Sequence, residues 1–171
     1  MTSRERVQAA LRHQESDRVP IDLGGMRSTG IQAIAYNRLK AHLGIEDGQT
    51  MMYDIMQQLA QPETEILDRF GVDIVDIGRA FNTAETDWNN ITLSNGNPAQ
   101  YPAWFQPRRE ADGSWTAFSA DGTPIAKMPA KATFYDQIYF PYLDGYPETY
   151  TELPRQMDKV LWAALVHSPW D

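Results

Sequence analysis

The stretch Thr2–Gly30 constrains the fold most, because a capped helix there leads into a short apolar segment that ends in glycines. Thr2 and Glu5 stand in the capping-box relation, and apolar residues follow at helical spacing. Val19–Leu23 then has the composition of a buried strand, and Gly24-Gly25 follows it. In proteins that alternate strands and helices, ligands bind where a strand ends in such a loop. The sequence therefore predicts the start of an α/β enzyme.

Composition excludes several classes of function. The chain has 171 residues, with 15 Lys and Arg against 23 Asp and Glu, and its basic residues are scattered. This distribution predicts no binding of nucleic acid or of an anionic membrane surface. The chain has no cysteine, so it offers no disulfide and no thiolate. We expect a cytoplasmic protein, because no secretory signal and no run of about 18 apolar residues is present.

A second strand is expected after three helical segments. The first helix begins at Ser28 or Thr29 and stops at Gly44, the second covers Met51–Ala60, and the third runs from Pro62 to Gly71. Val72–Ile77 alternates and is rich in β-branched residues, so it is expected to be a strand. A crossover of this length predicts that this strand and Val19–Leu23 are parallel neighbours.

The character of the chain changes after Arg79. Asp112-Gly113 and Asp121-Gly122 separate the segments 103–110, 114–119 and 123–128. Such turns between aromatic and β-branched segments predict a small antiparallel meander, which we place in a β-rich insertion over residues 79–133. Residues 134–150 are interpreted as a packed aromatic loop, and residues 153–165 as a last amphipathic helix.

Several motifs, taken in order, resemble the amino-terminal part of the uroporphyrinogen decarboxylase superfamily. They are Arg4-Glu5-Arg6-Val7 with Ala9-Ala10-Leu11, then Asp17-Arg18-Val19-Pro20-Ile21, then Leu67-Asp68-Arg69-Phe70-Gly71-Val72-Asp73. Asp112-Gly113-Ser114-Trp115 and Asp121-Gly122-Thr123-Pro124 resemble the insertion of the methyltransferase-like branch. The resemblance covers most of the chain.

The resemblance implies an α/β fold, with residues 1–171 as the amino-terminal segment of a TIM (β/α)8 barrel that also carries the meander. Such a barrel takes about 250 residues, so the segment is expected to be the first portion of a longer barrel or one half of a split one. The implied activity of the complete barrel is corrinoid-linked methyl transfer or demethylation. The implied partners are a small-molecule substrate, a corrinoid protein, a carboxyl-terminal half or a second copy of the chain.

Departures from the family pattern bear on the choice of activity. The decarboxylase branch has an arginine-rich element after its first strand, where this chain keeps only Arg27, and its essential aspartate has no secure counterpart among Asp76, Gly78 and Arg79. The methyltransferase branch uses zinc held by His and Cys from its carboxyl-terminal half. No cofactor is therefore expected within this segment, and zinc belongs to the complete barrel. Uroporphyrinogen decarboxylation of tetrapyrrole biosynthesis, and a non-catalytic module that oligomerises or binds a partner chain, remain open alternatives.

Six residues are candidates for substrate binding, all at the ends of the two expected strands. They are Asp22, Gly24, Gly25, Arg27, Asp76 and Arg79. Arg27 could bind a carboxylate in bidentate fashion, or could form an ion pair with Asp22 that shapes the loop. The two glycines allow close approach of a ligand, although a tight turn explains them as well. Asp76 either lines the site or forms a structural pair with Arg79. The residues that would carry out catalysis are not identified by the sequence.

The histidines and the aromatic loop have simpler interpretations. His13, His42 and His167 lie at expected helix ends without ligand spacing, so we assign them to structure. Six aromatic residues of the loop could form the wall of a substrate pocket or a corrinoid-protein interface, but a small core under the loop is the interpretation we favour. These residues are Tyr135, Tyr139, Phe140, Tyr142, Tyr146 and Tyr150.

Overall fold

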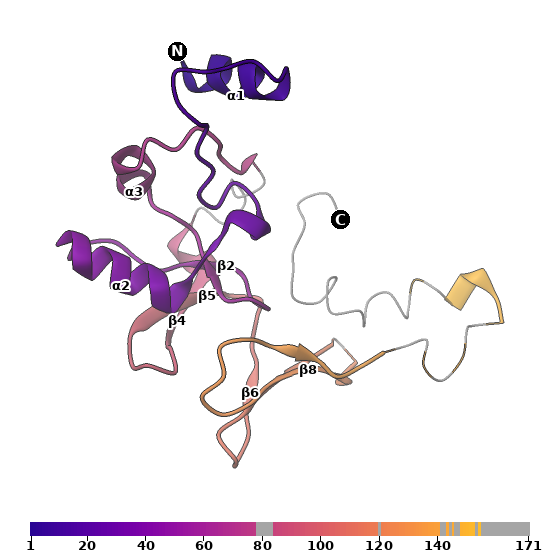
Figure 1. Cartoon of the computed structure of the whole chain (residues 1–171). Coiled ribbons are helices and arrows are strands. Elements are labelled where there is room, and N and C mark those ends of the chain that lie inside the picture. The colour runs from indigo at the N-terminus through magenta and orange to yellow at the C-terminus, as the bar shows by residue number, and fades with distance from the viewer. Residues whose placement is uncertain are drawn as a thin grey trace.

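Antiparallel strand pairs, and not alternating strands and helices, dominate the fold (Figure 1). The computed structural model describes residues 1–77, 84–119, 121–140, 143, 145, 148–152 and 154. Within these residues three sheets form, with the strand orders β1-β3-β2, β4-β5 and β6-β7-β8-β9. The strands are β1 (Ile31–Gln32), β2 (Met52–Asp54), β3 (Leu59–Ala60), β4 (Trp88–Thr92), β5 (Pro98–Pro102), β6 (Arg108–Arg109), β7 (Trp115–Phe118), β8 (Pro124–Met128) and β9 (Asp136–Gln137).

Several helix ends that depend on local chemistry lie close to the expected positions. The start expected at Ser28 or Thr29 is wrong, because Arg27–Thr29 form a 3-10 turn, Ile31–Gln32 form a strand, and the helix begins at Ala33. Helix α1 (Ser3–Leu11) begins with the complete capping box of Thr2 and Glu5. Helix α2 (Ala33–Leu43) ends at Gly44, whose φ of 71° is the left-handed conformation that glycine tolerates best. Helix α3 (Thr64–Arg69) begins two residues after Pro62. Three short 3-10 turns complete the description, namely η1 (Arg27–Thr29), η3 (Glu85–Asp87) and η4 (Tyr150–Glu152).

The prediction of a helix over Met51–Ala60 is wrong, because these residues form the β2–β3 hairpin. Asp54 Oδ1 accepts a hydrogen bond of 3.0 Å from the Gln57 amide, and Gln58 has a φ of 54°. This side-chain bond and the left-handed residue reverse the chain direction. Several apolar residues of the segment are buried all the same, since Met52 and Ile55 are both fully inaccessible. Their spacing fits a helix and a tight hairpin equally well.

The expected partial TIM barrel is also wrong. The segments Val19–Leu23 and Val72–Ile77 run parallel, but they share only one isolated bridge, between Asp22 and Ile74. All strand pairs within the three sheets are antiparallel. Because neither segment is covered on both faces, Val19 stays 80% exposed and Val75 64% exposed. A parallel sheet requires such cover.

The antiparallel meander is present where the Asp-Gly turns predicted it. Asp112-Gly113 lies between β6 and β7, and Asp121-Gly122 lies between β7 and β8. Strand β9 extends the sheet by pairing with β8. The β4–β5 hairpin was not expected, although Asn95-Gly96 at its turn is a strong hairpin signal. Pro98 and Pro102 are the two ends of β5.

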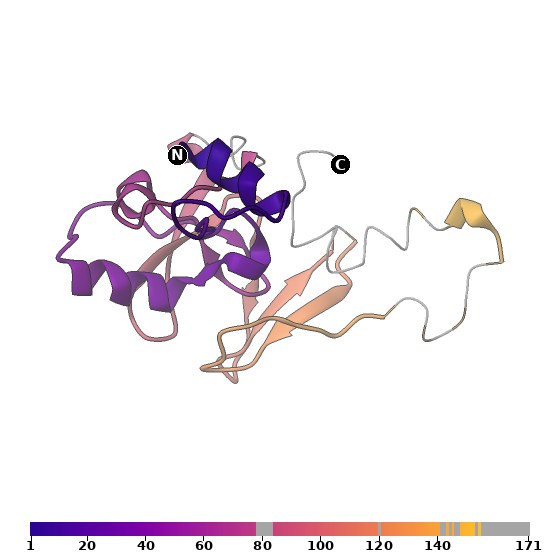
Figure 2. The same cartoon turned by 45° about the horizontal axis from the view of Figure 1, so that its top comes forward.

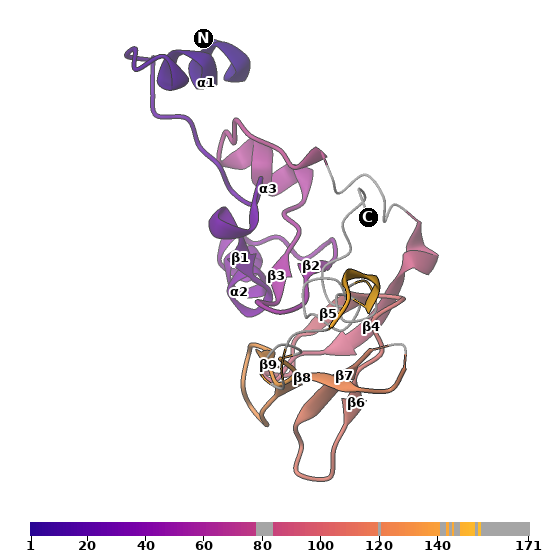
Figure 3. The ribbon, with the colours of Figure 1, turned by 90° about the vertical axis from the view of Figure 1, so that its right-hand side faces the viewer.

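One core cluster extends from α2 to the β6–β9 sheet. It joins Ala33 and Tyr36 of α2, Met52 of β2, Tyr101 of β5 and Ala126 of β8. An isolated bridge between Met51 and Gln100 connects the first sheet to β5. Figure 2 shows the β6–β9 sheet projecting from the part that holds α2. Helix α1 lies at the end of the molecule away from the β6–β9 sheet (Figure 3).

The aromatic loop is only partly a small core. Tyr135 is 3% exposed and Tyr139 packs against the core cluster, as the core interpretation predicts. That interpretation is wrong for Phe140 and Tyr150, which are 48% and 90% exposed. Tyr142, Tyr146 and the expected last helix over residues 153–165 lie outside the described residues, apart from residue 154. His13 and His42 lie at helix ends as expected, and His167 lies outside the described residues.

Candidate functional site

The loop Asp22–Arg27 is shaped by its own hydrogen bonds. Asp22 Oδ1 accepts a hydrogen bond of 2.7 Å from the Gly25 amide, and the Gly24 amide donates to the Thr29 carbonyl at 2.9 Å. A Cβ atom on Gly25 would lie 2.6 Å from Asp22 Oδ1 and 2.8 Å from Ile74 Cγ2. Gly24 has a φ of 78°. Both glycines therefore have a structural reason for their positions, as the turn interpretation predicts.

Arg27 forms an ion pair with Asp54, which lies in the β2–β3 segment where the sequence predicts a helix. Arg27 Nε lies 3.0 Å from Asp54 Oδ2. The Asp54 side chain is inaccessible, whereas that of Arg27 is 37% exposed. A buried carboxylate thus lies against a partly exposed guanidinium, although Asp54 Oδ2 accepts no hydrogen bond from the described residues. The signal that could have identified Asp54 is its charge within the otherwise apolar stripe of Met51–Ala60.

The two glycines and Asp76 share one small pocket, which we call the glycine-loop pocket. It lies between the loop, residues 61–62, Leu67 of α3 and residues 74–76, and its volume is about 80 Å³. Pockets that enclose small-molecule ligands measure about 300–1,000 Å³. The glycine-loop pocket can therefore hold a water or one end of a ligand, but not a whole substrate. Asp22 and Arg27 do not line it, and Arg79 lies outside the described residues.

Four charged residues from the motifs form a second cluster, the amino-terminal ion cluster of Arg6, Asp17, Arg18 and Asp73. Arg6 binds Asp17 through Nε at 2.7 Å and Nη2 at 2.9 Å, and its Nη1 also contacts Asp73. Arg18 Nη1 reaches Asp73 at 2.7 Å. The cluster joins α1 to the segment after α3, so these motif residues hold the fold together.

Electrostatics within the amino-terminal ion cluster favour the charged carboxylates. Burial raises the pKa of Asp73, but hydrogen bonds from the Ile21 amide, the Ser3 hydroxyl and the two guanidinium groups outweigh it. The pKa of Asp73 therefore lies well below its ordinary range. Hydrogen bonds from Arg6 and the amino terminus likewise lower the pKa of Asp17. The pKa of Arg6 is raised, chiefly by its hydrogen bond to Asp17.

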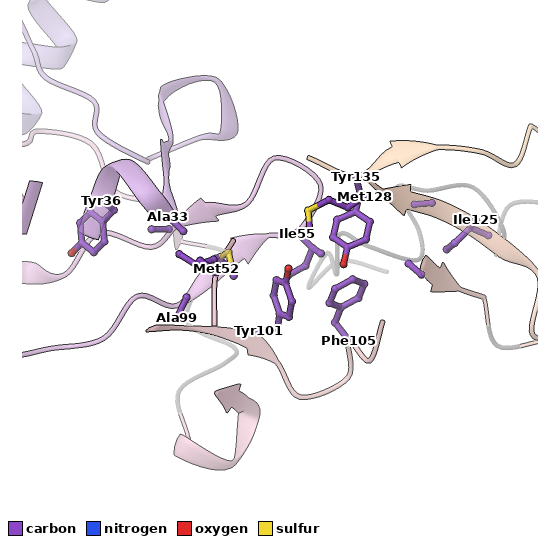
Figure 4. Packing of buried hydrophobic residues seen from close by; sticks show 14 of the residues in the cluster. Ala33, Tyr36, Met52, Ile55, Ala99, Tyr101, Phe105, Ile125, Met128 and Tyr135 are labelled. Carbon is purple, nitrogen blue, oxygen red and sulfur yellow. The ribbon is translucent and has the colours of Figure 1, made fainter. Parts of the chain in front are cut away.

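A much larger pocket, not anticipated from the sequence, lies between the β4–β5 hairpin and the β6–β9 sheet. This aromatic pocket measures about 720 Å³, and its walls include rings from Tyr101, Phe105 and Trp115. The rings of Tyr101 and Phe105 meet edge to face, with centroids 5.0 Å apart (Figure 4). Burial raises the pKa of the Tyr101 hydroxyl to about 12. Burial also raises the pKa of Tyr135, which packs on Phe105 at 5.6 Å.

A third hollow, of about 570 Å³, lies between α2 and β5, and the Lys40 ammonium group that lines it has a structural role. Lys40 Nζ donates to the Gln49 carbonyl at 3.1 Å and contacts Glu63 Oε2 at 3.0 Å. The Tyr36 hydroxyl donates to the same Glu63 oxygen at 2.9 Å. Lys40 is thus buried in an arrangement that connects α2 to the start of α3.

Comparisons of the chain with family models, with curated proteins and with solved structures found no match. Among the described residues no helix is long and apolar enough to cross a membrane. Within the same residues, no three His, Asp or Glu side chains come together in a way that could hold a metal ion. The family resemblance therefore depends on the motifs quoted above.

Proposed function

We propose that the chain is the amino-terminal part of a methyltransferase-like protein of the uroporphyrinogen decarboxylase superfamily, and that its Asp22–Arg27 loop helps to bind the substrate. The observation that carries this proposal is the bridge between Asp22 and Ile74. It brings together two motif-bearing segments that are far apart in the sequence. As a result, Gly24, Gly25 and Asp76 line one pocket.

The role of the loop in this proposal is to position a ligand. Arg27 Nε forms an ion pair with Asp54, and the Arg27 side chain is exposed enough to meet a carboxylate or a similar anion. The glycine-loop pocket accommodates only one end of a ligand. The remaining contacts would come from a partner chain, a corrinoid protein or further residues.

Zinc does not fit the described residues. The chain has no cysteine, and the described His, Asp and Glu side chains do not gather into a set of three. In this proposal zinc, which would deprotonate the thiol acceptor, has ligands from outside this chain. This chain then contributes binding and orientation, and no step of methyl transfer is assigned to its residues.

Co-expression with the polypeptide encoded directly downstream tests the proposal. We expect the complex to contain zinc and to transfer methyl groups from methylcobalamin to a thiol, measured by the change in corrinoid absorbance. Arg27→Gln should raise KM about tenfold, the effect of one lost charge-assisted contact, with little change in kcat. Arg12→Gln, at an exposed position, is the matched control.

Two results would contradict the proposal. Absence of both metal and turnover in the complex would reject it. Formation of coproporphyrinogen from uroporphyrinogen would instead identify the decarboxylase branch.

A second candidate function is association without catalysis, favoured by the apolar side chains that flank the Asp22–Ile74 bridge. Val19, Val75 and Ile77 are 80%, 64% and 78% exposed. Exposed apolar residues beside an incompletely paired edge favour contact with another chain. We expect light scattering to give a mass above that of one chain, and Val75→Lys to reduce it. A monomer at all concentrations would exclude self-association.

A further inference from the structure

We infer that the aromatic pocket is a binding site for a small planar anion, of the chemical class of ring-bearing carboxylates. Its volume of about 720 Å³ lies within the range of about 300–1,000 Å³ that ligand sites occupy. The inference does not depend on the family resemblance, because the aromatic pocket and the Asp22–Arg27 loop share no residue.

Charge selects an anion at this site. The residues that line the aromatic pocket include Arg109 and Lys131 but no Asp or Glu. The chain as a whole carries a formal charge of −8, with 23 acidic residues against 15 basic ones. Arg109 and Lys131 are both exposed, so the two cations at the pocket attract anions from solvent although the chain as a whole is acidic.

The walls of the pocket favour a planar ligand. Tyr101, Phe105 and Trp115 present aromatic rings, and Met128 adds a polarizable side chain. The Arg109 guanidinium carbon lies 5.9 Å from the centroid of the Trp115 ring. A ring in the pocket can pack against the aromatic walls while its carboxylate faces the cation.

Backbone strain is concentrated at the same pocket. Among the described residues, the non-glycine residues with positive φ are His13, Gln58 and Lys131, and the last two line the pocket. Left-handed backbone at such residues is unfavourable and tends to persist at binding sites. Gln58 is 3% exposed, and its Nε2 donates to the Tyr101 hydroxyl at 2.9 Å. The strained residue thereby fixes one wall of the pocket.

Titration of the full chain with 2-naphthoate tests this inference, with the Trp115 indole N–H resonance as the readout. We expect saturable binding that weakens as NaCl is added, and binding of neutral 2-naphthamide that is about tenfold weaker. Arg109→Gln should weaken naphthoate binding about tenfold without altering naphthamide binding. Lys131→Asn should act in the same direction, and asparagine tolerates the left-handed backbone there.

Arg108→Gln is the matched control, because Arg108 is the neighbouring residue of β6 and lies on its other face. Its guanidinium carbon is 4.4 Å from the centroid of the Phe118 ring, and its Nη2 lies 3.0 Å from Glu110 Oε1. We expect this variant to bind naphthoate as the parent chain does. The inference fails if 2-naphthoate does not perturb Trp115, if the amide binds as tightly as the acid, or if both arginine variants weaken binding equally. Circular dichroism confirms that each variant is folded.

Discussion

The amino-terminal ion cluster and the aromatic pocket hold their parts of the molecule together by different means. In the cluster, Arg6 and Arg18 converge on the inaccessible carboxylate of Asp73. Around the pocket, rings such as those of Tyr101 and Phe105 pack against one another edge to face. The comparison shows that charges join segments distant in the sequence, whereas apolar burial forms the continuous core. We therefore expect low pH to destabilise the amino-terminal ion cluster, and substitutions that leave a cavity to destabilise the core around the aromatic pocket.

The largest effect is expected from Asp73→Asn. Removing the shared carboxylate leaves two guanidinium groups without their main partner, so we expect Tm to fall by about 10 °C at pH 7. Asp68→Asn, at an exposed position on α3, should change Tm little. Thermal unfolding followed by circular dichroism measures both. Equal Tm values for the two variants would show that the ion cluster does not stabilise the fold.

The same cluster predicts the acid dependence of stability. The pKa values of Asp17 and Asp73 are lowered in the fold, so their contribution is complete above the ordinary aspartate pKa of about 3.9. It is lost as pH falls below about 4 toward the folded-state pKa values. Urea unfolding at several pH values should show this loss in the parent chain and a weaker one in Asp73→Asn.

Phe105→Ala should produce the next largest loss of stability, and it tests the packing at the aromatic pocket. Phe105 is 5% exposed and contacts both Tyr101 and Tyr135. The cavity left by the missing ring should lower the free energy of unfolding by about 3–5 kcal/mol. This loss should not change with pH. Phe134→Ala, at a side chain that is 51% exposed, should change it by less than about 0.5 kcal/mol. Similar losses in the two variants would argue against tight packing at Phe105.

Gly25→Ala should have an intermediate effect and test the Asp22 loop. The added Cβ would meet Asp22 Oδ1 and Ile74 Cγ2, so we expect a loss of about 1–3 kcal/mol. In Gly44→Ala the added Cβ would meet no atom within 4 Å. The expected cost of about 1 kcal/mol therefore comes from the left-handed backbone alone. Urea unfolding of both variants separates the two causes. A cost at Gly25 below that at Gly44 would mean that the loop moves aside easily.

The smallest effect, and one of opposite sign, is expected from Lys131→Gly. Glycine relieves the positive φ of 67°, so the free energy of unfolding should rise by about 0.5–1 kcal/mol. If the aromatic pocket binds anions, the same variant should bind 2-naphthoate more weakly. A stabilised variant with unchanged binding would separate the strain at residue 131 from ligand recognition.

The sequence predicts those parts of this fold that depend on neighbouring residues. The capping box at Thr2, the left-handed stop at Gly44 and the Asp-Gly turns of the meander act within a few residues, and all are present. The Val72–Ile77 segment required partners on both sides, and local alternation does not reveal whether those partners exist. Met51–Ala60 had a spacing that suits two structures, and Asp54 decided between them.

The candidate sites follow the same division. The turn at Gly24 and Gly25 could be predicted, because it depends on residues of the same loop. The Arg27–Asp54 pair could not, since it requires the β2–β3 hairpin to form first. The aromatic pocket was hidden for a similar reason, because Gln58, Tyr101 and Trp115 come from three separate strand pairs or their turns.

Helix α1 contributes no residue to the core cluster among the described positions, and its buried residues are Arg6 and Ala9. A helix anchored in this way can detach as a unit while the strands around Tyr101 stay folded. Amide hydrogen exchange in α1 should therefore accelerate as pH falls below about 4, before the β4–β5 and β7–β8 amides respond. The amino-terminal end would then be the first target of a protease at low pH.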